Sequence, residues 1–432
     1  MLPPHMRRAA AIGILALLLV STLSIIDGTA DAPADTPVDD STLPTVESRL
    51  LDESEMTLGQ VEALNSIGMG RGANTNWSAV GGSGETDEIY EMLLDSNGDI
   101  IVCGTIYQVS QFGSIQVHTE GEGDILIAKL TKSGTWEWAV SAGTALYYDE
   151  CRGITIDSND NVYGTGYIRG DVNFGNHSVS SNGFDGYIAK VSPNGTWDWA
   201  RKFGGIDIDV GWDLAADNYN NLYLTGYYQN FSEFDTVQLT TAGTSENARF
   251  FVAYYNFSSS SFTWAKDSDG NGHAVPYQIV VETSTNDVYI AGYHTGTEQF
   301  GSWTSSPASV YAGFLLKYDD AGNFQWGEHI VGSTCPLGYN CGVYFNNLVI
   351  HPIDGVVVGG NFLMEYRANG TVYSASGDWD VIVAWYRSNG MREWVYSAGG
   401  VSDDRLQALS VCLLYTSPSP RDQRGSRMPS SA

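Results

Sequence analysis

The sequence predicts an all-β fold, a β-propeller of four-stranded antiparallel blades. Three observations predict it. Tryptophan-containing motifs recur at a nearly constant interval, Pro/Asn/Gly turns separate alternating apolar runs, and no segment of the repeated region has a convincing helical period. The composition agrees, because 25 Tyr and 12 Trp favour strands and 49 Gly favour the turns between them.

Six tryptophans mark the repeat. Short motifs such as EWAVS, DWARK and QWGEH surround them, and they are Trp77, Trp138, Trp199, Trp264, Trp326 and Trp394. Neighbours in this series are roughly 60 to 70 residues apart, a spacing typical of repeat architectures. A glycine that ends an apolar strand (IIVCG, VYGTG, LYLTG) and the strand that precedes each Trp hairpin (DILIAKL, DGYIAKV, DVIVAWY) recur in the same order.

The second unit illustrates the strands of one repeat. Strand-like segments occupy 153–156, 162–168, 185–191 and 196–203, and a loop with Phe174 and Gly175 follows the second segment. Between the last two segments, the turn Ser-Pro-Asn-Gly is a strong hairpin signal. Four antiparallel strands per unit are typical of a propeller blade. Since one blade cannot cover both faces of its own sheet, we expect the repeated Trp and Tyr side chains to pack between blades.

The order of these motifs resembles SBBP-type β-propeller repeat proteins of prokaryotic surfaces. The shared string is W-A, G-G, D-x-x-[GN]-N-V-Y-x-x-G-Y, F-G and D-x-x-I-A-K-x-x-x-x-G-x-W, and it covers residues 75–411. The resemblance implies a propeller in a surface or secreted protein. Some units depart from the string: the strands that begin at Arg249 and Ala312 lack the leading Asp, and His351–Gly355 replaces the Asp-rich turn.

The N-terminus predicts export. Arg7 and Arg8 precede an apolar run over 9–26, and 30–32 offers a small-x-small cleavage site. We expect residues 1–32 to be a signal peptide, with an uncleaved membrane anchor as the alternative. Residues 33–74 are rich in Asp, Pro, Thr and Ser and predict an acidic disordered spacer. The expected location is extracellular or at the cell surface.

The C-terminal residues 412–432 do not continue the repeat. They contain CLLYTSPSPRD and SRMPSSA, which look like translated sequencing-adapter DNA. The repeat stops at Val411, within the first strand of a sixth blade. We therefore expect five complete blades, a truncated ring, and an outer strand at Trp77 whose own blade partners are absent.

Charge and the lack of catalytic motifs restrict the function. A formal net charge of -29 repels phosphate backbones, so nucleic acid is not an expected partner. The histidines share no repeat position, and neither a nucleophile elbow nor a phosphate loop is present. The favoured hypothesis is a non-catalytic exported scaffold that binds a protein, a glycan or the cell envelope, with membrane contact only through an uncleaved N-terminus. An exported enzyme acting on polysaccharide or peptide and a structural envelope component are the alternatives.

One segment is a candidate calcium site. Asp267, Asp269 and Asn271 match D-x-[DN]-x-[DN]-G, the start of a calcium-binding loop. Gln278 stands where such a loop has a bidentate Glu, and a solvated polar loop is the alternative. The turns that begin at Asp95 and Asp157 resemble the same motif, although Asp at these positions also caps turns without metal. No other cofactor is expected.

An aspartate recurs about ten residues after the tryptophan in several units. These aspartates are Asp87, Asp149, Asp209 and Asp404. We expect them to form a ring at one end of the propeller. Each side chain would cap the turn that enters the first strand of a blade. A polar rim that binds a cation or another ligand is the alternative.

The cysteines and sequons carry the remaining expectations. Cys335 and Cys341 flank a short loop and are the disulfide candidate, with two free thiols as the alternative. Cys103 lies in a strand and is expected to be a small buried apolar residue. Glycosylation candidates are the six Asn-x-Ser/Thr sites Asn76, Asn176, Asn194, Asn230, Asn256 and Asn369.

Overall fold

The structure, a computed structural model, describes residues 78–85, 87–241, 247–307, 311–332, 342–368 and 371–411, with only the backbone of residues 368, 377 and 378. All regular elements in these ranges are strands. The described residues contain no helix that could span a membrane. Several sequence-based expectations lie outside the described residues. They concern the N-terminal segment, the spacer, the C-terminal tail, Trp77, Cys335, Cys341, Asn76 and Asn369.

The described residues form five units of four antiparallel strands, which we call blades 1 to 5 in chain order; four are separate sheets, and the third is extended by two short strands of the fourth unit. Blade 1 contains β2 (Glu88–Leu94), β3 (Ile100–Ile106), β6 (Asp124–Leu130) and β7 (Trp136–Ala142). Blade 2 contains β8 (Glu150–Ile156), β9 (Val162–Ile168), β12 (Asp185–Val191) and β13 (Trp197–Phe203). Blade 3 contains β14 (Asp209–Ala216), β15 (Leu222–Tyr228), β18 (Arg249–Asn256) and β19 (Ser261–Gly270). Blade 4 contains β20 (Ala274–Glu282), β21 (Asp287–His294), β24 (Ala312–Tyr318) and β25 (Phe324–Val331). Blade 5 contains β26 (Gly342–Ile350), β27 (Val356–Ala368), β28 (Thr371–Tyr386) and β29 (Arg392–Ala398).

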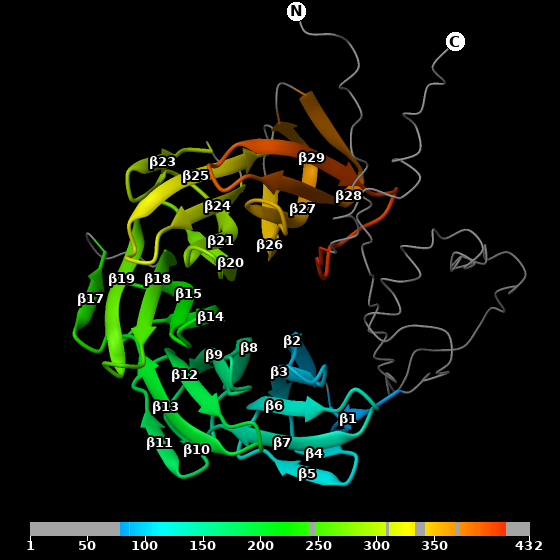
Figure 1. The fold of residues 1–432 in the computed structure, drawn as a ribbon, viewed down its shortest axis with the longest axis vertical. Coiled ribbons are helices and arrows are strands. Elements are labelled where there is room, and N and C mark those ends of the chain that lie inside the picture. Colours follow the sequence, from blue (N-terminus) through cyan, green and yellow to red (C-terminus); the bar gives the residue numbers. More distant parts are fainter. Residues whose placement is uncertain are drawn as a thin grey trace, which may run out of the picture. The chain divides into compact units, whose positions relative to one another are not determined.

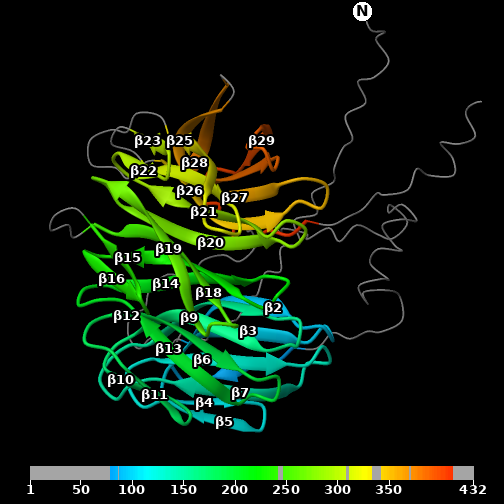
Figure 2. The ribbon, with the colours of Figure 1, turned by 60° about the vertical axis from the view of Figure 1, so that its left-hand side comes forward.

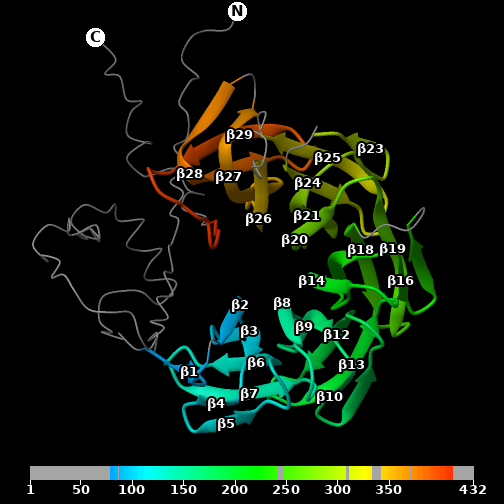
Figure 3. The ribbon, with the colours of Figure 1, turned by 180° about the vertical axis from the view of Figure 1, so that it is seen from behind.

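The blades follow one another around a common centre. Figures 1 and 3 show the first strand of each blade (β2, β8, β14, β20 and β26) turned toward this centre, with the last strand on the outside. Figure 2 shows the same sheets stacked in chain order, from blue and cyan to orange. Within each blade, neighbouring strands follow one another in chain order, as in a meander. This arrangement is the predicted propeller architecture.

A short hairpin follows the second strand in four blades. Four strand pairs form these hairpins: β4 (Val109–Phe112) with β5 (Ile115–His118), β10 (Asp171–Phe174) with β11 (His177–Ser180), β16 (Phe231–Phe234) with β17 (Val237–Thr240), and β22 (Glu298–Phe300) with β23 (Trp303–Ser305). The expected loop is therefore wrong for Phe174, which ends β10, whereas Gly175 lies in the turn between β10 and β11. Val172 and Phe174 are buried while Asp171 and Asn173 are exposed, so even four residues suffice for an alternating strand. In blade 5 the hairpin is continuous with the long strands β27 and β28.

These hairpins also link neighbouring blades. The end of β19 in blade 3 pairs with β22 of blade 4, and single bridges join Gly204 to Glu233 and Gly332 to Tyr366. The short strand β1 (Gly81–Gly82) pairs with β4 in the same way, so it holds the place of an outer strand beside blade 1. Outer strands therefore pair beyond their own sheet.

The core lies between the blades. One cluster combines Ile125 and Ile127 of blade 1 with Ile154 and Tyr187 of blade 2, and three further clusters join blades 2 and 3, 3 and 4, and 4 and 5 in the same manner. The repeated tryptophans belong to these layers: Trp138 is buried, and the equivalent residues in blades 2 to 4 pack against the clusters. The expected packing role of these aromatic residues is confirmed.

The G-x-W part of the repeat is explained by a glycine in the turn between the third and fourth strands, which lies against the tryptophan of the preceding blade. Gly195 of blade 2 adopts a φ of +80°, and a Cβ atom there would lie 2.6 Å from the indole of Trp138 in blade 1. The indole nitrogen of Trp138 donates a hydrogen bond to the carbonyl oxygen of Pro193 in the same turn, at 3.0 Å. Gly322 and Gly390 lie against the tryptophans of blades 3 and 4 in the same way. The tryptophan of one blade therefore packs on a bare turn of the next.

Blades 1 and 2 are also joined covalently. Cys103 of β3 and Cys151 of β8 form a disulfide, and both side chains are fully buried. Cys103 is buried as expected, but its expected role as an unbonded apolar residue is wrong. The sequence positions differ by 48 residues, and only the stacking of the two blades brings the sulfur atoms together.

The contact between Trp138 and Gly195 predicts the effect of a single added methyl group. Gly195→Ala should lower the free energy of unfolding by about 2 to 4 kcal/mol, because it adds a steric clash to an unfavourable positive φ. Gly98→Ala is the matched control, since Gly98 has a φ of +79° but no neighbour within 4 Å of the added atom. It should cost only about 1 to 2 kcal/mol. Urea unfolding measures both, and equal losses would contradict a tight contact between the blades.

Candidate functional site

One end of the blades repeats the same Asp-capped turn. The carboxylate of Asp95 accepts backbone N–H groups from Asn97 and Asp99 at 2.9 Å, and the turn that begins at Asp157 is built in the same way. The turns after Asp217 and Asp319 follow the pattern. Because the capping oxygen is engaged by the backbone, these calcium-like turns are explained as side-chain caps, the alternative given by the sequence.

The calcium candidate lies on the last strand of blade 3 and just after it. Asp267 and Asp269 belong to β19 and line a cavity of about 420 Å³, and Tyr228 donates its hydroxyl to Asp267 at 2.6 Å. The side-chain oxygen of Asn271 accepts the N–H of Thr297 at 2.9 Å. Among the described residues, no group of three or more His, Cys, Asp or Glu is placed to hold a metal ion. Calcium at this position stays a prediction.

At the opposite end, the repeated aspartates cap the turns that lead into the first strands. Asp149 accepts the N–H and hydroxyl of Thr144 and the N–H of Arg169, and Asp209 accepts the N–H of Gly205 at 2.8 Å. Two further turns have the same cap, formed by Asp87 and Asp404. The expected capping role is confirmed. Asp149 and Asp209 are fully buried, so they do not form an open polar rim.

Burial makes these caps poor acids. It raises the pKa of Asp149 to about 7 and that of Asp209 to about 8, and backbone N–H donors oppose the shift only in part. Asp185 approaches Asp209 closely enough to raise its pKa further, while Lys202 lowers it and also pairs with Asp185 at 2.7 Å. Gly204 separates the two carboxylates, since a Cβ there would lie 2.4 Å from Asp185 Oδ1 and 3.0 Å from Asp209 Oδ2.

Each first strand carries a β-bulge near this same end. The register shifts at equivalent places in all five blades, and the bulged residues are Tyr90, Arg152, Trp212, Tyr277 and Asn346. A bulge leaves one residue out of the ladder and re-aims its side chain. Three of these residues are aromatic, whereas blade 2 has an arginine and blade 5 an asparagine at this position, so the chemistry varies here from blade to blade.

In three blades the side chain after the bulge accepts a hydrogen bond from the next blade. Glu91 accepts the N–H of Ile154 in blade 2 at 2.7 Å, Asp213 accepts that of Ile279 in blade 4 at 2.9 Å, and Gln278 accepts that of Leu348 in blade 5. Blade 2 has Gly153 at this position, and a Cβ there would lie 2.7 Å from the Cα atom of Asp213. The acceptors thus bind backbone N–H groups on the first strands of the neighbouring blades.

Burial raises the pKa of both carboxyl groups that accept these hydrogen bonds, Glu91 and Asp213. The pKa of Glu91 is raised well above its ordinary value, first by burial and then by the charge of Asp213, and burial raises the pKa of Asp213 to about 7. The two acids approach each other because blade 2 has only a glycine between them. The sequence did not indicate this pair, since the residues belong to blades 1 and 3.

The bulged side chains meet in one layer. The Arg152 guanidinium lies 4.3 Å from the ring centre of Tyr90 and 5.1 Å from that of Trp212, and it pairs with Glu150. The Trp212 ring in turn contacts Tyr277 at 5.1 Å. Ring contacts continue through blades 4 and 5 by way of Tyr293, Tyr344 and Trp379. These side chains are half-buried, so a layer of aromatic rings and one arginine is partly exposed at this end.

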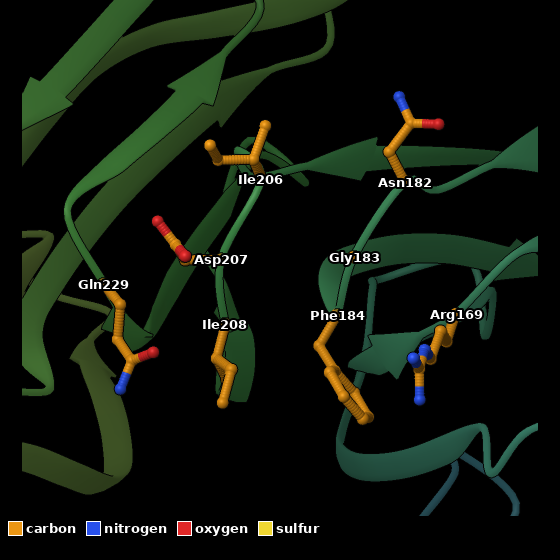
Figure 4. Close-up of a pocket in the computed structure, with 8 residues that line it drawn as sticks. All are labelled: Arg169, Asn182, Gly183, Phe184, Ile206, Asp207, Ile208 and Gln229. Atoms are coloured by element: carbon orange, nitrogen blue, oxygen red, sulfur yellow. The ribbon is translucent and has the colours of Figure 1, made fainter. Parts of the chain in front are cut away.

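An open cavity of about 580 Å³ lies at the same end, between blades 2 and 3. Its lining residues come from the end of β9, the segment before β12, the turn between β13 and β14, and the end of β15; they are Arg169, Asn182, Gly183, Phe184, Ile206, Asp207, Ile208 and Gln229. Figure 4 shows Arg169 beside Phe184, with the side chains of Ile208 and Gln229 pointing to the same side. Asp207 points to the other side. Sequence reasoning did not identify this site.

Blade 4 contains a Ser/His cluster that the sequence analysis also missed. The Ser305 hydroxyl lies 2.8 Å from His294 Nε2 and 2.5 Å from His329 Nδ1. Burial lowers the pKa of His294 to about 4 and that of His329 below its ordinary value. Ser305 is only 1% exposed and occupies the place of Val117 and its apolar equivalents in other hairpins. This Ser is therefore inaccessible to a substrate, and the cluster is a polar replacement for an apolar contact.

The described sequons differ in accessibility. Asn176 is exposed in the turn between β10 and β11, and Asn194 is exposed in the turn between β12 and β13. Asn230 is half-buried with a φ of 57°, and its side-chain nitrogen, the atom that would carry a glycan, donates to Asp207 at 2.9 Å. Asn256 is half-buried, and its side-chain oxygen accepts the N–H of Ser259. Glycosylation at all these positions stays a prediction.

A match to a family model agrees with the propeller architecture. A family model described as SBBP, a beta-propeller repeat, matches residues 137–172, which run from β7 into β10. An uncharacterized WD repeat-containing protein of Acanthamoeba polyphaga mimivirus is 24% identical over 248 residues, a match that covers 48% of this chain and 18% of that protein. This chain thus spans less than a fifth of that relative's length. A crystal structure of a protein of unknown function from Bacteroides caccae covers 56% of this chain and 82% of its own, at 11% identity and a TM-score of 0.25.

The raised pKa values of the capping aspartates predict how stability depends on pH. In the folded state Asp209 holds its proton up to about pH 8, whereas an unfolded Asp releases it near pH 4. The folded state therefore binds more protons, and the free energy of unfolding should fall as the pH rises from 6.5 to 8.5, by up to about 1.4 kcal/mol per pH unit for one such group. Burial lowers the pKa of His294 and His329 in the folded state, so their unfolded forms take up protons near pH 6.5 and oppose this trend at the low end of the window. Between pH 7.5 and 8.5 both histidines are neutral in both states and contribute little.

Asp209→Asn should flatten this pH dependence, because the amide has no proton to release. Asp171→Asn, at an exposed position of β10, is the matched control and should keep the wild-type slope. Chemical unfolding at pH 6.5, 7.5 and 8.5 provides the comparison. Identical slopes for the wild type and Asp209→Asn would show that Asp209 is already ionised in this range.

Proposed function

We propose that this β-propeller repeat protein is an exported, non-catalytic binding module that recognises a glycan at the cell surface or outside the cell. The observation that carries the proposal is the layer formed by Tyr90, Arg152, Trp212 and Tyr277 with the ring contacts that extend it. Partly exposed aromatic rings with a few polar groups are typical of ligand sites. The opposite end, by contrast, presents the same Asp-capped turn in blade after blade.

The proposal of a glycan rests on the chemistry of this end. Aromatic faces pack against the C–H groups of a sugar ring, while Glu150 and nearby amides such as Asn182 and Gln229 suit its hydroxyl groups. The formal charge of -29 disfavours nucleic acid and other densely anionic polymers. No cofactor is needed for binding of this kind. A protein partner at the same end would be recognised through the same rings and is an outcome of the test below.

A non-catalytic role is supported by how the polar groups are used. Glu91 and Asp213 accept backbone N–H groups of neighbouring blades, so their oxygens serve the interblade contact. Ser305 and His294 are buried within blade 4. The aspartates Asp149 and Asp209 cap turns in the interior. Each group that resembles catalytic machinery thus has a structural partner.

Export is supported by three independent features. The N-terminal Arg7 and Arg8 precede a long apolar run. A buried disulfide joins Cys103 to Cys151, and such bonds persist in oxidising compartments. The sequons at Asn176 and Asn194 are exposed at turns, where a glycan could project.

A second candidate, an exported enzyme acting on polysaccharide or peptide, is favoured by one observation. The acids Glu91 and Asp213 converge across Gly153, and both have raised pKa values, as general acids of hydrolases do. Incubation of the purified chain with polysaccharide and peptide substrates tests this candidate. Product that is released by the wild type but not by Glu91→Gln would favour the enzyme over the binding module.

A panel of immobilised oligosaccharides, neutral and acidic, tests the binding proposal. The full chain should bind at least one member. Tyr148→Ser should weaken that binding several-fold, because Tyr148 lies just before β8 at the proposed end, contacts the Tyr107 ring and is 44% exposed. Tyr219→Ser is the matched control, since Tyr219 is 74% exposed in the Asp217 turn of the opposite end. Absence of binding to every saccharide, or equal loss in both variants, would overturn the proposal; binding only to protein probes at the Tyr148 end would replace the glycan with a protein partner.

A further inference from the structure

We infer that the cavity between blades 2 and 3 binds the carboxylate of a uronic-acid residue in an acidic glycan, and that Arg169 is the group that recognises it. This inference rests on the proposed glycan binding and narrows it to one ligand class and one site. It depends on the geometry of Arg169, on the rest of the cavity lining and on the charge of the surrounding protein.

Arg169 is held in place without an ion pair. Its guanidinium lies 4.1 Å from the ring centre of Tyr147 and 4.8 Å from that of Phe184, so two aromatic rings position it. Its backbone N–H donates to the buried carboxylate of Asp149 at 2.8 Å, which fixes the base of the side chain. Within the described ranges the guanidinium forms no ion pair and no hydrogen bond to a protein atom. Its N–H groups remain available for an anion.

This arrangement is unusual in so acidic a chain. The sequence has 50 Asp and Glu against 21 Lys and Arg, and other arginines have carboxylate partners, as in Arg152 with Glu150 and Arg201 with Asp235. The buried Arg249 pairs with Glu298 in blade 4 at 3.0 Å. In the other blades the residue three positions after the repeated strand glycine is not basic; the equivalents of Arg169 are Tyr107, Gln229, Thr295 and Leu363. The repeat therefore does not require an arginine here.

The rest of the lining suits a sugar ring that carries one carboxylate. Phe184 and Ile208 provide an apolar wall on the side toward which Arg169 points (Figure 4). Ile206 is 80% exposed on the rim, where an apolar side chain marks a contact surface. Gln229 adds a polar side chain on the side toward which Arg169 points, whereas Asn182 points to the other side (Figure 4). A volume of about 580 Å³ accommodates one or two sugar residues.

The charge balance favours a ligand with a single local anion. A guanidinium binds a carboxylate through two parallel N–H···O bonds, a geometry that neutral sugars cannot provide. Arg169 is the only cation among the lining residues, so the cavity is expected to bind one carboxylate at a time. Asp207 on the rim and the net charge of -29 disfavour phosphate polymers. A carboxylate and a sulfate ester share this monoanionic chemistry, so a sulfated sugar is included as a separate arm of the test.

Isothermal titration of the full chain with trigalacturonate and with its methyl ester tests the inference. The ester keeps the sugar backbone but replaces each carboxylate with an uncharged methyl ester, so the acid should bind at least tenfold more tightly than the ester. Arg169→Met should weaken binding of the acid at least tenfold, to the level of the ester, and Arg169→Lys should retain part of it. Binding of the acid should also weaken with added NaCl, since the site is open to solvent.

Arg367→Met is the matched control, because Arg367 is an exposed arginine on β27 and its replacement changes the net charge equally. It should bind trigalacturonate like the wild type, and melting curves should confirm that all variants are folded. Equal binding of acid and ester, equal effects of the two arginine variants, or equal binding of sodium acetate would overturn the inference. Tighter binding of a sulfated than of a carboxylated trisaccharide would overturn the uronate assignment. If the ester binds well and Tyr148→Ser abolishes that binding, this inference fails while the proposed glycan binding stands.

Discussion

The packing of one blade against the next is the constraint on which the rest of this structure depends. A four-stranded sheet rich in Val, Ile, Tyr and Trp has two apolar faces, and only a neighbouring sheet can cover each of them. The interblade clusters show how this is achieved, with buried residues from two blades in each layer. The sequence repeat follows from it: Trp138 recurs as the contact that one blade offers, and Gly195 recurs as the bare turn that receives it.

The same constraint determines where charge is tolerated. The turns that connect one blade to the next have backbone N–H groups with no partner in a sheet. Buried aspartates such as Asp149 and Asp209 accept hydrogen bonds from these groups. Burying a carboxylate disfavours its ionised form, which is why these groups have raised pKa values. Where a blade junction lacks the aspartate, other pairs replace it, such as Arg249 with Glu298 between blades 3 and 4. The chain is thus acidic both on its surface and at selected positions inside.

The two ends of the blades consequently differ in what they can do. At one end the Asp-capped turns are fixed by their own hydrogen bonds and are alike. At the other end the bulges release one side chain per blade from the ladder, and its identity is free to vary. Arg152, Trp212 and Arg169 are found there, and they have counterparts of different chemistry in the other blades. Function in a repeat protein is expected where the repeat is broken, and both proposals concern this end.

Periodicity predicted the strands well because alternation and turn residues are local properties. The second unit shows this: predicted segments at 162–168 and 185–191 coincide with β9 and β12. The capping role of Asp209 was also predictable, since capping is a short-range interaction. The disulfide of Cys103 with Cys151, the cavity at Arg169 and the Ser305 cluster were not, because each depends on residues that only blade stacking brings together. Comparison of repeat positions would have singled out Arg169 and Ser305 as unusual, but not their partners.

Mapping the disulfide by mass spectrometry tests the stacking of the blades most directly. The purified full chain would be alkylated, digested without reduction and searched for cross-linked peptides. Blade packing as described places Cys103 of blade 1 against Cys151 of blade 2, so a peptide pair that joins these two residues is predicted. Recovery of either cysteine as an alkylated free thiol, or bonded to a cysteine elsewhere in the chain, would contradict the packing between blades 1 and 2.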